Sequence, residues 1–154
     1  MQDERELRFI IGHEMGHIYG KHVLYKVIIR AGALGLAGGF DFSSSVILPL
    51  LLAAAKWDRE TEYSADAAGL ICCQDLQVAE RAFAKLAGGL HESIIGEINV
   101  DEFLRQADER DFSAYSEAFQ LASLMMSDHP YLSSRIKKLR EYSEEERYKS
   151  LWRK

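Results

Sequence analysis

The sequence predicts a mainly α-helical fold, and three observations support this prediction. Apolar residues recur at spacings of three and four in most segments, as they do on one face of a helix. No segment alternates apolar and polar residues convincingly, as a half-buried strand does. Only two of the 154 residues are proline, so long helices are permitted over most of the chain. The length suggests a single domain over residues 1–154.

The first helix is expected over about residues 3–27, with Asp3 as its N-cap. Five apolar residues at helical spacing predict its buried face: Leu7, Ile10, Ile11, Met15 and Ile18. A second helix is expected from about residue 46 to 75, and Pro49 should limit how early it starts. The later helices are expected at about 76–86, 99–110, 113–126, after Pro130, and after a capping box that begins at Ser143.

An apolar insert at about residues 31–55 is divided by Asp41 into pieces of ten and fourteen residues. Neither piece reaches the roughly 18 residues that a helix needs to cross a bilayer. Four glycines, Gly32, Gly35, Gly38 and Gly39, should weaken any helix in its first half. We interpret the insert as a mobile or buried hairpin, and a hairpin that dips into a membrane is the alternative.

Composition excludes some functions and favours a cellular compartment. The formal net charge is -5, and no basic stripe with interleaved aromatic residues indicates a nucleic-acid partner. The two cysteines, Cys72 and Cys73, are adjacent and cannot build a disulfide framework. No signal peptide is visible at the N-terminus. These features predict a cytoplasmic protein, with membrane association through the insert as an open question.

The segment His13-Glu14-Met15-Gly16-His17 reads as H-E-x-x-H within the first expected helix. Residues four apart lie on one helix face, so both imidazoles can reach one metal ion. Neutral imidazole suits Zn²⁺, and two such ligands leave room for a third ligand and a water. Glu14 beside them can take a proton from that water as it attacks a carbonyl. The pattern indicates a metallopeptidase, although it also arises by chance in helices.

The third ligand distinguishes two classes of zinc peptidase. A metzincin would have its third histidine at position 23, but this chain has Val23 there. The nearest histidine, His22, is one residue early, and on a helix that step turns its side chain about 100° away from the required direction. We therefore predict His22 to be a surface or near-site histidine. The other class uses a glutamate from a second helix, and Glu62 fits it, with Asp66 four residues later to orient a ligand histidine. The alternative is an exposed helix start with an ordinary Arg59–Glu62 ion pair.

Glu62-x-x-x-Asp66 after a distant H-E-x-x-H resembles the gluzincin pattern. The longer run Arg59-x-x-Glu62-x-x-Ala65-Asp66 is similar to the family that contains HtpX and the CAAX prenyl endopeptidases. A late His129-Pro130 segment followed by Arg135 also resembles that family. The resemblance extends over about residues 7–142, with three motifs in the expected order, and it looks closest to the small soluble bacterial and plant members.

This resemblance implies a zinc-dependent endopeptidase acting on peptides or unfolded proteins. Its metal ligands would be His13, His17 and Glu62, and its general base would be Glu14. Two further residues would complete the site. His129 would lie near the cleft as a catalytic residue that stabilises the oxyanion, and Arg135 would brace the site through Glu62 or Asp66.

The sequence departs from the family at two places. Asp66 is followed by Ala67, where the family usually has arginine. Family members also have a small sheet before the zinc helix, whose edge strand binds substrate, but only twelve residues precede His13 here and we find no strand among them. We therefore expect that sheet to be absent and Met1 to begin a catalytic-core fragment. The apolar area left exposed predicts a homodimer, and it motivates the alternative function, a non-catalytic zinc-stabilised module that binds protein partners.

Overall fold

A computed structural model describes residues 3–39, 44–87, 101, 105 and 132–152 of the chain. The helices in these ranges are α1 (Glu4–Tyr19), α2 (His22–Gly39), α3 (Ser44–Cys73), α4 (Leu76–Ala87), α8 (Leu132–Glu144) and α9 (Glu146–Trp152). The described ranges contain no strand, so the prediction of a mainly α fold is confirmed. The helices expected at about 99–110 and 113–126 lie almost entirely outside these ranges.

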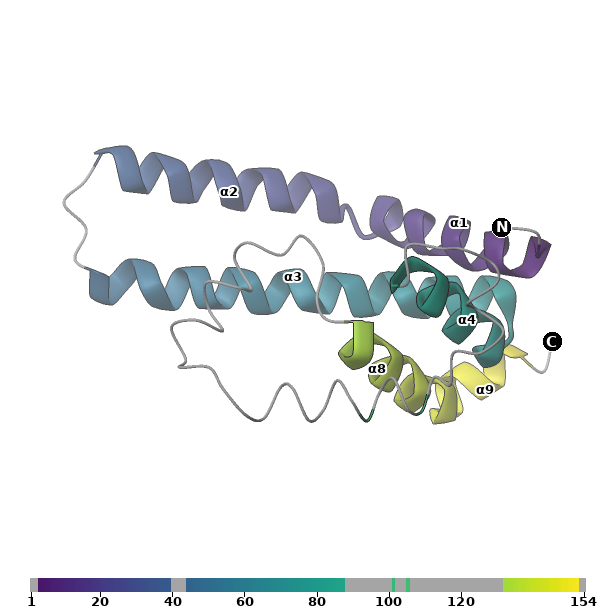
Figure 1. The fold of residues 1–154 in the computed structure, drawn as a ribbon. Coiled ribbons are helices and arrows are strands. Elements are labelled where there is room, and N and C mark those ends of the chain that lie inside the picture. Colours follow the sequence, from purple (N-terminus) through teal and green to yellow (C-terminus); the bar gives the residue numbers. More distant parts are fainter. Residues whose placement is uncertain (1–2, 40–43, 88–100, 102–104, 106–131, 153–154) are drawn as a thin grey trace.

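The long helix α3 organises the structure. Helices α1 and α2 follow one another along one side of α3 and run antiparallel to it (Figure 1). The shorter helices α4, α8 and α9 gather around the C-terminal part of α3, whereas α2 and the first half of α3 extend away from them as a hairpin. The two expected zinc motifs, on α1 and α3, are thereby placed on facing helices, as the sequence predicted.

The first expected helix is two helices. The N-cap prediction is confirmed, because the Asp3 side chain accepts a hydrogen bond of 2.9 Å from the Arg5 N–H. The helix ends at Tyr19 instead of continuing to about residue 27, since Lys21 adopts a positive φ of 53°. This left-handed conformation is uncommon for a residue with a Cβ. It redirects the chain before α2 begins at His22.

The predicted buried face of α1 is wrong in four of its five residues. Four of them are exposed, from 47% for Leu7 to 76% for Ile18, and only Ile10 packs partly against the core. The buried face instead contains Phe9 and two glycines, Gly12 and Gly16. Small residues form the contact of α1 with α3, and a hydrophobic pattern hardly registers them. The larger apolar residues that the pattern does register lie on the outer face of α1.

The two glycines let α1 approach the backbone of α3 closely. A Cβ on Gly12 would lie 2.7 Å from Cys72 Cβ, and one on Gly16 would lie 2.9 Å from Ala65 Cα. Contacts below 3.0 Å are essentially never made by real Cβ atoms. The separation of α1 and α3 therefore depends on glycine at both positions, and it sets the distance between the histidines of α1 and the acidic residues of α3.

The apolar insert is more helical than expected. Helix α2 continues through all four glycines to Gly39, and α3 begins at Ser44, ahead of Pro49. The expected weakness of the first half is therefore not seen, whereas α3 starts within two residues of the expected position, with Pro49 inside it. Among the described residues, no helix is sufficiently long and apolar to span a bilayer.

The core lies where α1, α3, α4, α8 and α9 meet. Phe9 of α1 and Phe83 of α4 contact edge to face at 5.3 Å, and Leu70, Ile136 and Tyr148 pack around them. The helices expected at 76–86 and after Pro130 are present as α4 and α8, each within two residues. The expected capping box is not formed. Ser143 lies inside α8, where its hydroxyl donates to the Arg140 carbonyl at 2.7 Å.

Candidate metal centre

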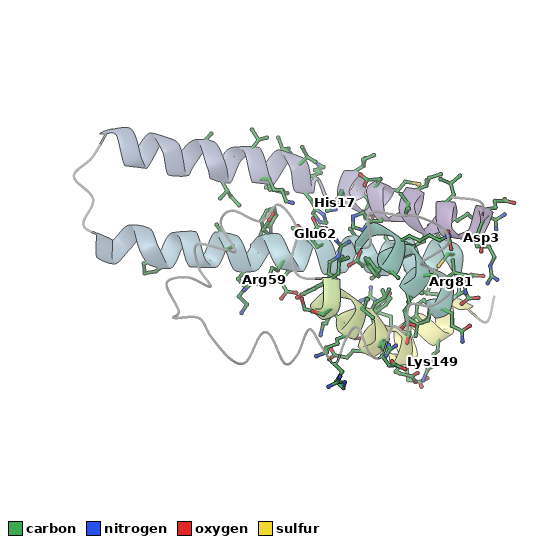
Figure 2. All side chains as sticks on the ribbon, viewed as in Figure 1. Asp3, His17, Arg59, Glu62, Arg81 and Lys149 are labelled. Atoms are coloured by element: carbon green, nitrogen blue, oxygen red, sulfur yellow. The ribbon has the colours of Figure 1, made fainter. Side chains whose placement is uncertain are left out.

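Three side chains that can bind a metal converge between α1 and α3. His13 and His17 lie one turn apart on α1. Glu62 lies across from His17 on α3 (Figure 2). The two histidine Nε2 atoms are 3.1 Å apart. Glu62 Oε1 lies 3.5 Å from His17 Nε2, and Glu62 Oε2 lies 3.8 Å from His13 Nε2. One ligand atom from each residue thus faces a common point.

The spacing of these atoms fits Zn²⁺. Ligands about 2.0–2.2 Å from a tetrahedral zinc ion lie about 3.3–3.6 Å from one another. The two histidine nitrogens, 3.1 Å apart, are close to this range. Glu62 approaches them with different oxygens, at 3.5 and 3.8 Å, and one ligand atom from each of the three residues lies within 4.8 Å of the others. Two imidazole nitrogens and one carboxylate are also a usual donor set for zinc in hydrolytic enzymes, with the fourth position left for water. The residues present are therefore suited to zinc.

Asp66 orients the first histidine. Its Oδ1 lies 2.9 Å from His13 Nδ1, and the carboxylate is buried. Because a carboxylate only accepts, the proton of neutral His13 belongs on Nδ1, which leaves the lone pair of Nε2 directed at the centre. The hydrogen bond that Asp66 was expected to accept from a ligand histidine is present, and it fixes the tautomer that metal binding requires.

Arg135 of α8 braces both carboxylates of α3. Its Nε and Nη2 donate to Asp66 at 2.8 and 2.6 Å, and its Nη1 lies 3.4 Å from Glu62 Oε2. Burial alone would lower the pKa of the guanidinium, but the hydrogen bonds and charge of Asp66, with Glu62, outweigh it and raise the pKa of Arg135. Arg135 therefore stays charged in a buried position, and its contacts include both partners expected from the sequence.

A second cation approaches Glu62 from α2. Lys26 Nζ lies 3.4 Å from Glu62 Oε1 and 2.9 Å from Asp58 Oδ1. Sequence reasoning missed Lys26, because α2 was expected to continue α1 rather than to fold as a separate helix. Asp58 and Glu62 are four residues apart on α3, so the pair that receives Lys26 was visible in the sequence, although its partner was not.

His22, the first residue of α2, also reaches the centre. Its Nδ1 lies 2.9 Å from Nδ1 of His17. Burial lowers the pKa of His17 and outweighs the opposing charge of Glu62. Burial, followed by the charge of Lys26, lowers the pKa of His22. The structure thus places His22 near the site, as expected, and both rings favour the neutral form.

Glu14 lies beside the centre and faces open space. Its side chain is exposed, and with His13 it lines a cavity of about 340 Å³ whose apolar walls are Phe9, Ile10, Phe83 and Leu132. A carboxylate at this place can exchange protons with a molecule in the cavity. The other expected catalytic residue, His129, lies outside the described residues, so its role stays a prediction.

Comparison with known proteins identifies the family of the chain. The sequence matches Peptidase family M48 over residues 1–143. The chain belongs to this family of metallopeptidases, which confirms the resemblance inferred from the motifs. No solved structure matches the chain.

One curated relative shows how much of a longer protein the chain resembles. The chain is 31% identical over 149 residues to the plastoglobule-localized metallopeptidase 48, chloroplastic, of Arabidopsis thaliana. The match covers 95% of this chain and 43% of the relative. The chain thus spans less than half the length of that relative.

Proposed function

We propose that this chain is a zinc-dependent endopeptidase that hydrolyses peptide bonds in peptides or unfolded proteins. The observation that carries the proposal is the convergence of His13, His17 and Glu62, whose ligand atoms lie within 4.8 Å of one another, beside Glu14. Membership of family M48 supports the same reaction class. The described residues thus combine a donor set for zinc with an accessible carboxylate beside a cavity.

Zinc, when bound by these three residues, would lower the pKa of a water and polarise the substrate carbonyl. Glu14 acts as the general base, because its exposed carboxylate can accept the proton of the attacking water. It then delivers that proton to the leaving amine. Asp66 and Arg135 hold His13 and Glu62 in place through buried hydrogen bonds and charge. We propose that His129 stabilises the oxyanion, as the family resemblance implies.

The wider setting of the enzyme is also a proposal. We expect a cytoplasmic protein, and membrane association through the insert at about residues 31–55 is the alternative to a hairpin that stays in water; exposed apolar residues just before the insert include Val27 and Ile28. The exposed apolar side chains of α1, such as Ile11 and Ile18, support association of two copies. Sedimentation with and without lipid vesicles tests both expectations.

Metal content and turnover measured together test the proposal. We expect about one zinc per chain by elemental analysis, and hydrolysis of labelled casein. Glu62→Gln should lose most of the zinc, whereas Glu60→Gln, an exposed neighbour on α3, should keep it. Glu14→Gln should keep zinc but lose about 100-fold or more in turnover, with Glu4→Gln on the same helix as the control. A folded wild type that takes up no added zinc would refute the proposal.

The exposed apolar face of α1 favours one other function, a zinc-stabilised module that binds protein partners. Its outer residues, Leu7, Ile11, Met15 and Ile18, would form the contact. The same measurements separate the two functions. Bound zinc in the wild type, with no turnover on any peptide and no difference between wild type and Glu14→Gln, would favour the module.

A further inference from the structure

One histidine beside the candidate metal centre has no role in the proposed reaction. His22 contacts His17 with its ring centroid 5.0 Å away and the two ring planes at 84°. The two Nδ1 atoms are 2.9 Å apart, which is a hydrogen-bond distance. His22 is absent from the group of residues whose ligand atoms converge, which comprises His13, His17 and Glu62. Its contact with the site is therefore made through His17.

The chain places His22 there by breaking the helix. In an uninterrupted helix, residues 17 and 22 would point about 140° apart and could not meet. The left-handed conformation of Lys21 turns the chain so that the first side chain of α2 folds back on the last turn of α1. The break that departs from the predicted single helix is thus what brings the two imidazoles together.

Two neighbours hold the His22 ring in this position. Trp57 of α3 contacts it edge to face at 6.4 Å. Gly20 lies directly beneath it, because a Cβ on Gly20 would lie 2.2 Å from His22 Nε2. The φ of Gly20 is −72°, which any residue can adopt, so glycine is needed there for space and not for backbone conformation. The ring is confined by residues from three segments of the chain.

The hydrogen bond has only one arrangement that suits metal binding. His17 Nε2 faces Glu62 Oε1 at 3.5 Å and His13 Nε2 at 3.1 Å, so this nitrogen must carry the lone pair that a metal takes. The proton of neutral His17 then belongs on Nδ1, where it needs an acceptor. His22 Nδ1 is placed to accept it, with the remaining His22 proton on Nε2.

We propose that His22 is a positioning residue that holds His17 in the metal-binding tautomer and orientation. It does for His17 what Asp66 does for His13 at the same distance of 2.9 Å. The two ligands thus have unlike partners, one a carboxylate and the other a neutral ring. Loss of such a partner typically weakens metal binding by about 10–100-fold. This inference rests on the proposed zinc site.

The test compares variants of the full chain by zinc affinity and by the visible absorption of bound Co²⁺. His22→Phe keeps a ring beside Trp57 but removes the acceptor, and we expect zinc affinity to fall about 10–100-fold with an altered Co²⁺ spectrum. His22→Asn places an oxygen near the position of Nδ1 and should recover most of the affinity and the spectrum. Val23→Ala, at an exposed neighbouring position, is the control and should change neither.

A second variant tests the inference without changing His22. Gly20→Ala should displace the ring and reproduce the loss seen with His22→Phe. Tight zinc binding in the wild type with unchanged affinity in His22→Phe would overturn this inference alone. Equal losses in His22→Asn and His22→Phe would also overturn it, because they would indicate a direct ligand. A wild type that binds no zinc would instead overturn the proposed function.

Discussion

Replacing Gly16 by alanine should push α1 away from α3 at the candidate metal centre. The added Cβ would lie 2.9 Å from Ala65 Cα, against 3.4 Å or more in ordinary contacts, so the helices must separate by about half an ångström. Backbone cannot rotate out of the way as a side chain can. Overpacking of this kind costs about 1–3 kcal/mol, and the helix propensity of alanine returns about 0.5–1 kcal/mol.

Gly32→Ala is a matched control, because a Cβ at this exposed position of α2 meets nothing within 4 Å. Both variants gain the same stabilisation from the higher helix propensity of alanine, so the difference between their free energies of unfolding isolates the cost of overpacking. Urea unfolding should therefore place Gly16→Ala about 1–3 kcal/mol below Gly32→Ala. Zinc affinity should fall only in Gly16→Ala, since metal–ligand distances tolerate about 0.2 Å. Equal stability and equal zinc affinity in the two variants would refute the close-packing argument.

Two further predictions concern buried polar groups. Arg135→Met should destabilise the protein by about 3–5 kcal/mol in urea unfolding, because it leaves the buried carboxylates of Glu62 and Asp66 without their shared cation. The control is Lys138→Met, at a position about half exposed on the same helix, which should change stability by less than about 1 kcal/mol. Equal effects of the two substitutions would contradict the bracing role of Arg135. Burial raises the pKa of Tyr148 to about 12, above its ordinary value near 10. The stability that this shift contributes is present below pH 10 and lost between about pH 10 and 12, so the wild type should lose about 2–3 kcal/mol more than Tyr148→Phe over that interval. Parallel stability curves for these two proteins would show that the phenol does not resist ionisation.

The sequence predicts the parts of the site that depend on spacing within one helix. His13 and His17 are one turn apart in any helix, and so are Glu62 and Asp66, so each pair shares a face before the fold is known. The placement of Arg135 came from the family resemblance, which implied a contact with Glu62 or Asp66, and the structure has both contacts. Spacing alone predicts only the pairs within one helix, because the contact of Arg135 depends on how α8 packs against α3.

The parts that the sequence did not predict depend on packing between helices and on one backbone dihedral. The contact face of α1 is made by Gly12 and Gly16, which carry no side chain for a hydrophobic pattern to detect. The break between α1 and α2 occurs at Lys21, a residue that favours a continuous helix. Gly20 directly before it is a residue type that often ends helices, but nothing in the sequence specifies the left-handed conformation of Lys21. Both His22 and Lys26 join the site only because the break is there.

The charges around the centre show why the base of the α2–α3 hairpin belongs to the site. With the side chains ionised, Asp58, Glu62, Asp66 and Glu14 supply four negative charges on or beside the centre, and Lys26 and Arg135 supply two positive ones. The remainder is two negative charges, which one divalent cation would neutralise. Without Lys26, one negative charge would remain after the divalent cation binds. This charge would lie close to the buried Glu62, where water and salt screen it poorly. The hairpin therefore adds one positive charge to the carboxylate-rich face of α3 opposite the two histidines, in addition to the His22 ring that contacts His17.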